Sequence, residues 1–266
     1  MNSDIQLNLQ KEQAALAKMY EENPATEKLH AIVIGEKGAG KTSLALTCPT
    51  PVHIDSFDPG GTDSVREGIK AGKIFVDTRF EKEDSNNPTA YALWEEEFKR
   101  RQREGYFHGL GTYILDGSTL FGDCMMNQIL KKEKQLRAGM NSKSDRAKQG
   151  MQIQDWGTYL DTFAQLARAL ALMPCHAILM GHIDRDMDEV QRAMIKGLML
   201  PGKSSEKVPI IFPEFYVLQV KEGKHVLLTQ NDGEFRATTR LGRGGRLDKY
   251  EPADISALLR KVGVSI

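Results

Sequence analysis

Residues 35–42 read Gly-Glu-Lys-Gly-Ala-Gly-Lys-Thr, and this stretch decides the fold. It follows the apolar run 31–34, Ala-Ile-Val-Ile, which has the composition of a buried strand. It precedes the run 43–46, Ser-Leu-Ala-Leu, which predicts the start of a helix. The pattern G-x-x-x-x-G-K-T between a strand and a helix is the complete context of a phosphate-binding P-loop. The sequence therefore predicts an α/β fold built around a nucleoside triphosphate site.

Each part of this loop has a chemical task. Its glycines let successive backbone N–H groups point at phosphate oxygens, and the helix N-terminus adds a partial positive charge. We expect Lys41 to reach the β- and γ-phosphates and the Thr42 hydroxyl to ligate Mg²⁺, so the predicted cofactors are ATP and Mg²⁺. The alternative is a glycine-rich turn with a merely solvated Lys41. The residues expected at the nucleotide are Gly35, Glu36, Lys37, Gly38, Ala39, Gly40, Lys41, Thr42 and Ser43.

Length and composition limit the function classes. The 266 residues suffice for one large α/β domain with additions. The formal net charge is zero, so a nucleic-acid site would have to be a local patch. The cysteines at 48, 124 and 175 are far apart in apolar surroundings, which suits a reducing compartment and shows no metal-like pair spacing. No apolar run approaches the ~20 residues that span a bilayer, and no signal-peptide pattern opens the chain. We expect a soluble, cytoplasmic protein with no membrane partner.

Residues 8–21 place apolar side chains among charged and amide residues, which predicts an amphipathic helix that Asn23-Pro24 ends. We expect residues 1–28 to form an N-terminal helical extension and residues 29–266 the nucleotide-binding domain. The helix is expected to fold against its own domain, with docking on a neighbouring subunit as the alternative.

Carboxylates follow two predicted strands downstream of the loop. The strand 52–55 is followed by Asp58, our first candidate for the general base, and it ends in Asp55, our second. A turn or capping role is the alternative for both. Residues 113–116, Tyr-Ile-Leu-Asp, match a Walker B strand, whose Asp116 would hold Mg²⁺ through a water. A further strand, 175–182, ends in His182, a candidate sensor of the γ-phosphate because this strand end lies near that phosphate in P-loop folds. A purely structural histidine is the alternative.

Two segments carry local positive charge. Basic residues outnumber acidic ones between 131 and 148, and the second half of this segment has loop composition. Residues 184–206 mix acids, bases and glycines, which predicts a second irregular loop of functional length. Mobile basic loops fit the phosphate backbone of DNA, and solvated surface loops are the alternative. The candidate DNA-binding residues are Lys143, Arg146, Lys148, Arg185, Lys196 and Lys203.

The remaining elements are predicted from periodicity. Residues 90–105, 118–137 and 156–170 follow helical spacing, and Trp156 and its aromatic neighbours are expected in the core rather than as base-stacking platforms. Residues 215–220, 225–230 and 234–240 predict consecutive antiparallel strands, and residues 252–261 a short closing helix. Arginines between them would reach a triphosphate across a subunit boundary, and solvated arginines are the alternative. These candidates are Arg240, Arg243 and Arg246.

The order of these features resembles the RecA core and, more closely, the phage-encoded RecA-like ATPases of the Sak type. Gly117 fits this resemblance, because AAA+ and helicase motors usually place a catalytic acid directly after the Walker B aspartate. The segments that carry the resemblance are Gly35–Thr42, Tyr113–Asp116, Gln154–Gly157, His176–His182, Pro201–Lys203, Pro213–Phe215 and Glu251–Asp254.

The resemblance implies a mostly parallel central sheet with antiparallel strands at its C-terminal end. It implies an ATPase that acts on single-stranded DNA in phage recombination or annealing, in the host cytoplasm, as a homo-oligomeric ring or filament. A single-strand-binding protein is a further implied partner. The loops near 139–153 and 184–206 would take the places of the two DNA-binding loops, and His182 that of the γ-phosphate-sensing amide. This sequence has no clear equivalent of the RecA-type catalytic glutamate and offers only Asp58 in its place. That departure implies slow ATP hydrolysis.

Two other function classes stay open. One is a nucleotide-dependent switch or assembly ATPase that engages protein partners without DNA, which the zero net charge permits. The other is a small-molecule kinase, for which the sequence offers no lid-like run of arginines after the core.

Overall fold

The computed structural model describes residues 2–23, 27–139, 151–188, 193–242 and 244–264. The α-helices are α1 (Asn2–Glu22), α2 (Arg66–Lys70), α3 (Ala90–Arg103), α4 (Ser118–Gly139), α5 (Ile153–Ala171), α6 (Ser204–Ile211) and α7 (Ile255–Val262). The 3-10 helices are η1 (Thr42–Thr47), η2 (Gly61–Val65), η3 (Arg79–Glu81) and η4 (Tyr106–Gly109). The strands are β1 (His30–Gly35), β2 (Val52–Ser56), β3 (Ile74–Asp77), β4 (Thr112–Asp116), β5 (His176–Gly181), β6 (Ile183–Asp188), β7 (Ala193–Leu198), β8 (Glu214–Lys221), β9 (Lys224–Leu228) and β10 (Tyr250–Pro252).

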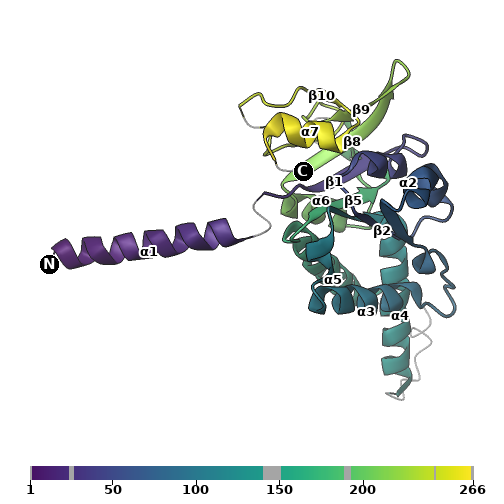
Figure 1. Ribbon diagram of the computed structural model, residues 1–266. Helices are drawn as coiled ribbons and strands as arrows, with labels where there is room; N and C mark the ends of the chain where they lie inside the picture. Colours follow the sequence, from purple (N-terminus) through teal and green to yellow (C-terminus); the bar gives the residue numbers. More distant parts are fainter. Residues whose placement is uncertain (1, 24–26, 140–150, 189–192, 243, 265–266) are drawn as a thin grey trace.

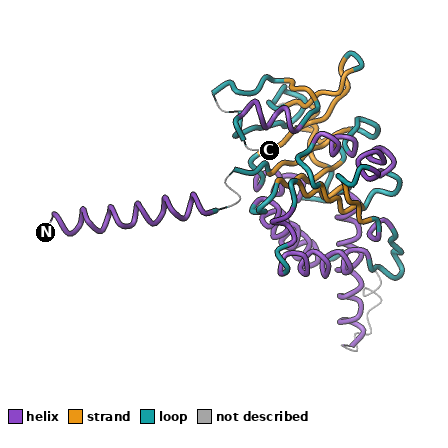
Figure 2. The backbone as a smooth tube through the Cα atoms, in the orientation of Figure 1, coloured by secondary structure: helices purple, strands orange, loops and turns teal. Residues whose placement is uncertain are grey.

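The central sheet has the strand order β10-β9-β8-β1-β5-β4-β2-β3. Its pairings from β8 to β3 are parallel, and those of β9 with β8 and with β10 are antiparallel (Figures 1 and 2). The α/β fold with antiparallel strands at the C-terminal end is therefore as predicted. Strand β5 lies between the P-loop strand β1 and β4, so the carboxyl ends of all three meet at one edge of the sheet.

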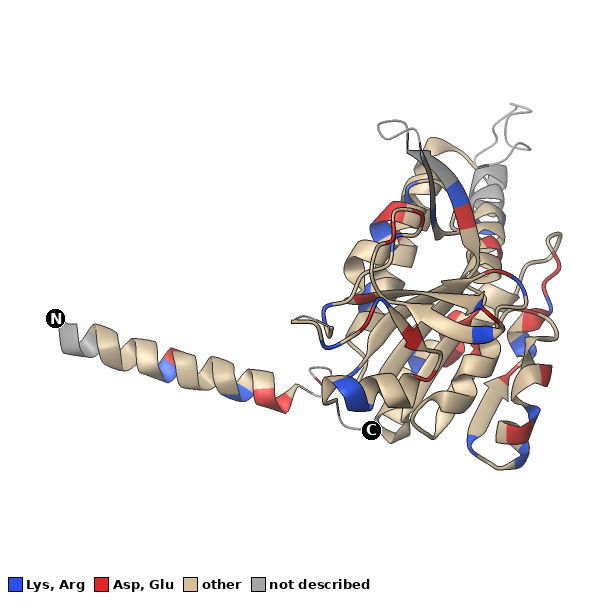
Figure 3. Cartoon of the chain, turned by 90° about the horizontal axis from the view of Figure 1, so that it is seen from above, with Lys and Arg blue, Asp and Glu red and all other residues tan. Residues whose placement is uncertain are grey.

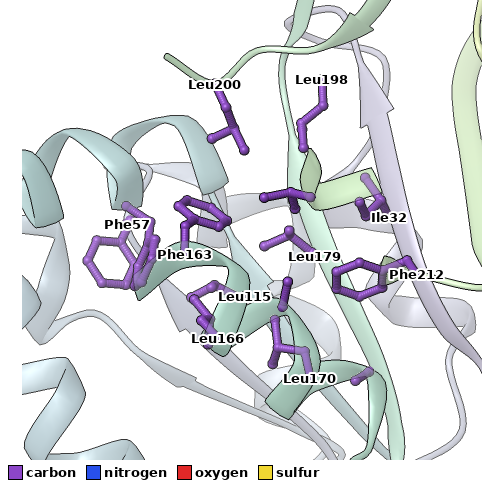
Figure 4. Packing of buried hydrophobic residues seen from close by; sticks show 14 of the residues in the cluster. Ile32, Phe57, Leu115, Phe163, Leu166, Leu170, Leu179, Leu198, Leu200 and Phe212 are labelled. Carbon is purple, nitrogen blue, oxygen red and sulfur yellow. The ribbon is translucent and has the colours of Figure 1, made fainter. Parts of the chain in front are cut away.

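The central strands are buried on both faces, which explains their almost continuous apolar sequence. Alternate residues of β1 serve opposite faces, with Ile32 and Ile34 in one core cluster and Ala31 and Val33 in the other. The first cluster includes aromatic rings from several elements (Figure 4). The predicted core role of the α5 aromatics holds only in part, since Trp156 is 38% exposed.

Two predicted elements differ from the structure. Residues 183–188 and 193–198 form the antiparallel strands β6 and β7 rather than parts of an irregular loop, and they pair residue by residue from Ile183–Leu198 to Asp188–Ala193. Residues 234–240 make only isolated bridges, from Phe235 to Lys196 and from Thr238 to Phe215. The third antiparallel strand is instead β10, which pairs with β9.

The N-terminal helix is longer than predicted and stands apart from the body (Figure 1). Its residues from Ile5 to Glu22 are all exposed, including Met19 at 67% and Tyr20 at 68%. The expectation that α1 folds against its own domain is therefore wrong. No helix in the described part of the chain combines the length and apolar character needed to cross a membrane.

Candidate functional site

The P-loop connects β1 to η1 through two glycines with left-handed backbone, Gly38 at φ 82° and Gly40 at φ 92°. The segment after it is a six-residue 3-10 helix rather than a longer α-helix, and Pro49 and Pro51 end it soon afterwards. The Lys41 side chain bends back along the loop. Its Nζ donates to the carbonyl oxygens of Gly35 at 2.9 Å and Glu36 at 3.1 Å.

The Lys41 ammonium is largely buried, with the residue 9% exposed. Burial lowers its pKa, and the negative charges of Asp116, Asp58 and Glu36 oppose that change. Lys41 therefore lies among acidic groups that favour its charged form, and a bound triphosphate would add further negative charge beside it.

Thr42 and Asp116 come together from the P-loop and the end of β4. The Thr42 hydroxyl donates to Asp116 Oδ2 at 2.6 Å, across 74 positions of sequence. Burial raises the Asp116 pKa, and the bond from Thr42 acts in the opposite direction. A hydroxyl beside a carboxylate is the set of hard oxygen donors that Mg²⁺ takes at phosphate sites, so these residues fit the ion.

Asp58 lies close to the same cluster. Its charge acts on the pKa values of Lys41, Asp116 and His182, so it is near all three. The structure also explains Gly117, which has φ 100°. A Cβ at that position would lie 3.3 Å from the Asp58 nitrogen and 3.5 Å from its Cβ. The missing side chain after the Walker B aspartate therefore leaves room for the Asp58 turn.

His182 follows the last residue of β5 and is half-buried. Burial lowers its pKa, the charge of Lys41 lowers it further, and the charge of Asp58 opposes both. A neutral imidazole at this strand end has one donor and one acceptor nitrogen. The four predicted catalytic residues thus gather at one edge of the sheet.

Glu81 is a neighbour of the site that sequence reasoning missed. It ends η3, and its Oε1 accepts a 2.7 Å hydrogen bond from Ser56 at the end of β2. Its charge also raises the Asp116 pKa. The only signal in the sequence is an acid four positions beyond the last residue of β3, too common a pattern to single out.

Asp55, the second candidate base, is a buried hydrogen-bond acceptor rather than a group open to water. Its side chain is fully buried, and its two oxygens accept from Arg101, Trp94 and Tyr113. His53 Nε2 lies 2.9 Å from Oδ1. A carboxylate with this many partners is not free to take a proton from water, so the structure assigns Asp55 to the packing of β2 against α3.

The predicted DNA-binding residues have different surroundings. Lys143, Arg146 and Lys148 lie outside the described residues. Arg185 is exposed and lies 3.8 Å from Glu36 of the P-loop, a surface pair of little energetic weight. Lys196 is engaged within the chain, since it pairs with Glu234 and its Nζ lies 4.8 Å from the centre of the Phe235 ring. Lys203 is exposed at the start of α6.

Two of the arginines predicted to reach a neighbour's triphosphate, Arg240 and Arg246, lie in the described residues. The Arg240 backbone nitrogen donates to Glu214 at the first residue of β8. Glu214 pairs with Ala31, four residues before Gly35, so this point lies ~13 Å along the sheet from the P-loop. Arg246 Nη1 donates to the Val262 carbonyl at 3.4 Å.

Arg243 lies outside the described residues. Arg240 also lines a cavity of about 600 Å³ between strands β6 and β7, α6 and the start of β8. The residues that line this cavity do not include the P-loop, so its size says nothing about the nucleotide site.

Comparisons with known proteins bear on the family. Residues 27–241 match the family model AAA_24, described as an AAA domain. A search of curated proteins found no match. Among solved structures, a KaiC-like protein from the hyperthermophilic archaeon Pyrococcus horikoshii OT3 is similar at 14% identity and TM-score 0.36, over 79% of this chain and 82% of that one. The RadB recombinase is similar at 13% identity and TM-score 0.34, over 74% and 78%. Such scores are too low to carry further conclusions, but the family match spans most of the chain, which therefore belongs to the AAA domain family AAA_24.

Proposed function

We propose that this chain binds ATP with Mg²⁺ and hydrolyses it. The observation that carries the proposal is the meeting of the P-loop with Thr42–Asp116 at 2.6 Å, beside Asp58 and His182. Lys41 would neutralise the β- and γ-phosphates, and Thr42 and Asp116 would hold the metal, which polarises the phosphate oxygens when bound. Asp58 would orient the attacking water, and His182 would contact the γ-phosphate.

We further propose that the ATPase is of RecA-like rather than AAA+ motor type and acts on single-stranded DNA in phage recombination or annealing. Gly117 supports the RecA-like type, because a side chain at this position would crowd the Asp58 turn. The basic segment 131–148 and the exposed Arg185 and Lys203 support the action on single-stranded DNA. A cytoplasmic location and a single-strand-binding protein as partner belong to the same proposal.

Assembly into a ring or filament is part of the proposal. Arg240 supports it, because its backbone is ~13 Å along the sheet from the P-loop of its own chain. An arginine at that place is better suited to a neighbour's triphosphate than to its own. Arg246 supports it less, since its guanidinium contacts a carbonyl of its own chain.

A nucleotide-dependent switch that engages proteins is the second candidate function. Figure 3 favours it, because in that view basic and acidic residues are interspersed over the described body. Lys196 adds to this, since its charge is already paired.

Hydrolysis assays with and without single-stranded DNA test the proposal. Lys41→Ala is expected to lower the hydrolysis rate by about 10²-fold or more, since it removes the cation at the phosphates. Lys99→Ala, at an exposed lysine of α3 outside the P-loop, is the matched control and is expected to retain most activity. Hydrolysis that survives Lys41→Ala would refute the ATPase assignment.

Replacing Lys143, Arg146 and Lys148 together by Glu separates the two candidate functions. The DNA proposal expects DNA binding to be lost while ATP binding is retained. A wild-type chain that binds ATP but no DNA at low salt would favour the switch.

A further inference from the structure

The β8–β9 hairpin lies beside the P-loop. Strand β8 pairs with β1 in a register that sets Leu218 opposite Gly35, the first residue of the loop. The hairpin continues beyond that point, with Val220 opposite His225. His225 therefore lies level with the loop that follows Gly35, although 190 positions separate the two residues in sequence.

His225 contacts the P-loop directly. Its Nδ1 is 2.8 Å from the Ala39 carbonyl oxygen. The ring is so close to Gly40 that a Cβ there would lie 3.1 Å from Nδ1 and 3.3 Å from Cε1. Because a carbonyl oxygen can only accept, Nδ1 carries the proton and donates. The His225 backbone is itself held, by pairing with Val220 and by a 3.1 Å bond from the Ala253 nitrogen to its carbonyl.

This contact acts on a single peptide unit. The peptide between Ala39 and Gly40 is planar and trans, so its C=O and its N–H point in opposite directions. When His225 draws the Ala39 carbonyl toward the hairpin, the Gly40 N–H is turned away from the hairpin. In a P-loop the N–H groups must face the phosphates. Because Gly40 has no Cβ, its φ of 92° can change and let this peptide rotate, and the hydrogen bond opposes that rotation.

We propose that His225 is a positioning residue that holds the Ala39–Gly40 peptide with its N–H toward the triphosphate. The proposal rests on the proposed function of the P-loop as an ATP site. Because His225 acts through the backbone and not on the reacting atoms, its effect falls on nucleotide affinity rather than on turnover.

Two substitutions test this. His225→Leu keeps apolar bulk over Gly40 but has no donor, whereas the amide of His225→Asn keeps a donor near the place of Nδ1. In the Leu variant, the Kd of a fluorescent ATP analogue and the KM for ATP are expected to rise roughly three- to ten-fold, the factor that one hydrogen bond supplies. The kcat at saturating ATP is expected to stay within about two-fold, and the Asn variant to recover most of the affinity. His108→Leu, at an exposed histidine of η4, is the control.

Three outcomes would overturn the proposal: equal affinity in the wild type and the Leu variant, equal losses in the Leu and Asn variants, or a fall in kcat at unchanged affinity. Circular dichroism checks that each variant is folded, and His225→Ala replaces the Leu variant if that one is not. A wild-type chain that binds no ATP would refute the proposed function and this inference together. An affinity loss in the Leu variant that the Asn variant does not share supports this inference while leaving the Lys41 assignment intact.

Discussion

The buried ion pair between Arg101 and Asp55 offers a quantitative test of how the site is supported. Arg101 lies in the last turn of α3, and its side chain is 7% exposed. Its Nη1 donates to Asp55 Oδ1 at 2.8 Å and its Nη2 to Asp77 Oδ2 at 2.6 Å. The pair ties α3 to β2, the strand that leads into Ser56 and Asp58. Arg101→Met keeps a long apolar side chain but removes the guanidinium.

The expected loss of unfolding free energy depends on which partners Asp55 and Asp77 keep in the variant. Asp77 retains Arg79 at 2.6 Å, so the loss falls on the fully buried Asp55. Breaking a buried pair costs ~3–5 kcal/mol, and the bonds that Asp55 keeps from Trp94 and Tyr113 favour the lower end. An unfolding entropy of ~2.1 cal/mol/K per residue gives ~0.56 kcal/mol/K for 266 residues. A loss of ~3 kcal/mol therefore lowers Tm by ~5 °C.

Thermal unfolding followed by circular dichroism measures this shift. Arg100→Met, one position earlier, is the matched control, because the Arg100 side chain is 44% exposed and pairs with Glu97 and Glu104 on the surface. We expect that control to move Tm by less than ~1 °C. A Tm loss for Arg101→Met no larger than that of the control would refute the reasoning. Adding Asp55→Asn to Arg101→Met is expected to restore part of the stability, because it removes the stranded charge.

Three further outcomes are expected. Asp116→Asn should abolish Mg²⁺-dependent hydrolysis yet raise the Tm of the nucleotide-free protein. Burial disfavours the charged form of this carboxyl and so raises its pKa, and the neutral amide avoids that cost. A lower Tm would contradict this expectation. Gly117→Ala places a methyl group 3.3 Å from the Asp58 nitrogen, at a residue whose φ is positive. The variant should lose ~1–3 kcal/mol of unfolding free energy in urea. An unchanged urea midpoint would argue against that crowding. Burial alone would raise the Asp77 pKa, but hydrogen bonds from two arginines hold it at about 2. Because this lies below the ordinary value of 3.8, the contribution of Asp77 to stability is complete above pH 3.8 and is lost as the pH falls toward 2. Urea titrations of wild type and Asp77→Asn between those values should therefore converge at the acid end, and parallel curves would contradict the shift.

The sequence alone was sufficient for the P-loop, for Asp116 at the end of its strand and for the α/β class of the fold. These features depend on local backbone needs: glycines where φ is positive, apolar runs where a strand is buried on both faces, and a carboxylate at a strand end. It also located α3, α4 and α5, whose apolar residues recur at the helical period. It failed at residues 183–188 and 193–198, where mixed polarity gave no sign of two strands that pair mainly with each other.

Only the tertiary structure decided which distant groups meet at the site. Glu81 with Ser56, Arg101 with Asp55, and His225 with Ala39 are contacts between residues 25, 46 and 186 positions apart. Such contacts depend on strand order and register, since one residue of slip in a strand would turn each side chain to the other face of the sheet. Local periodicity carries no information on that register. The sequence therefore located the loop for the triphosphate, and the fold supplied the side chains that surround it and hold its backbone.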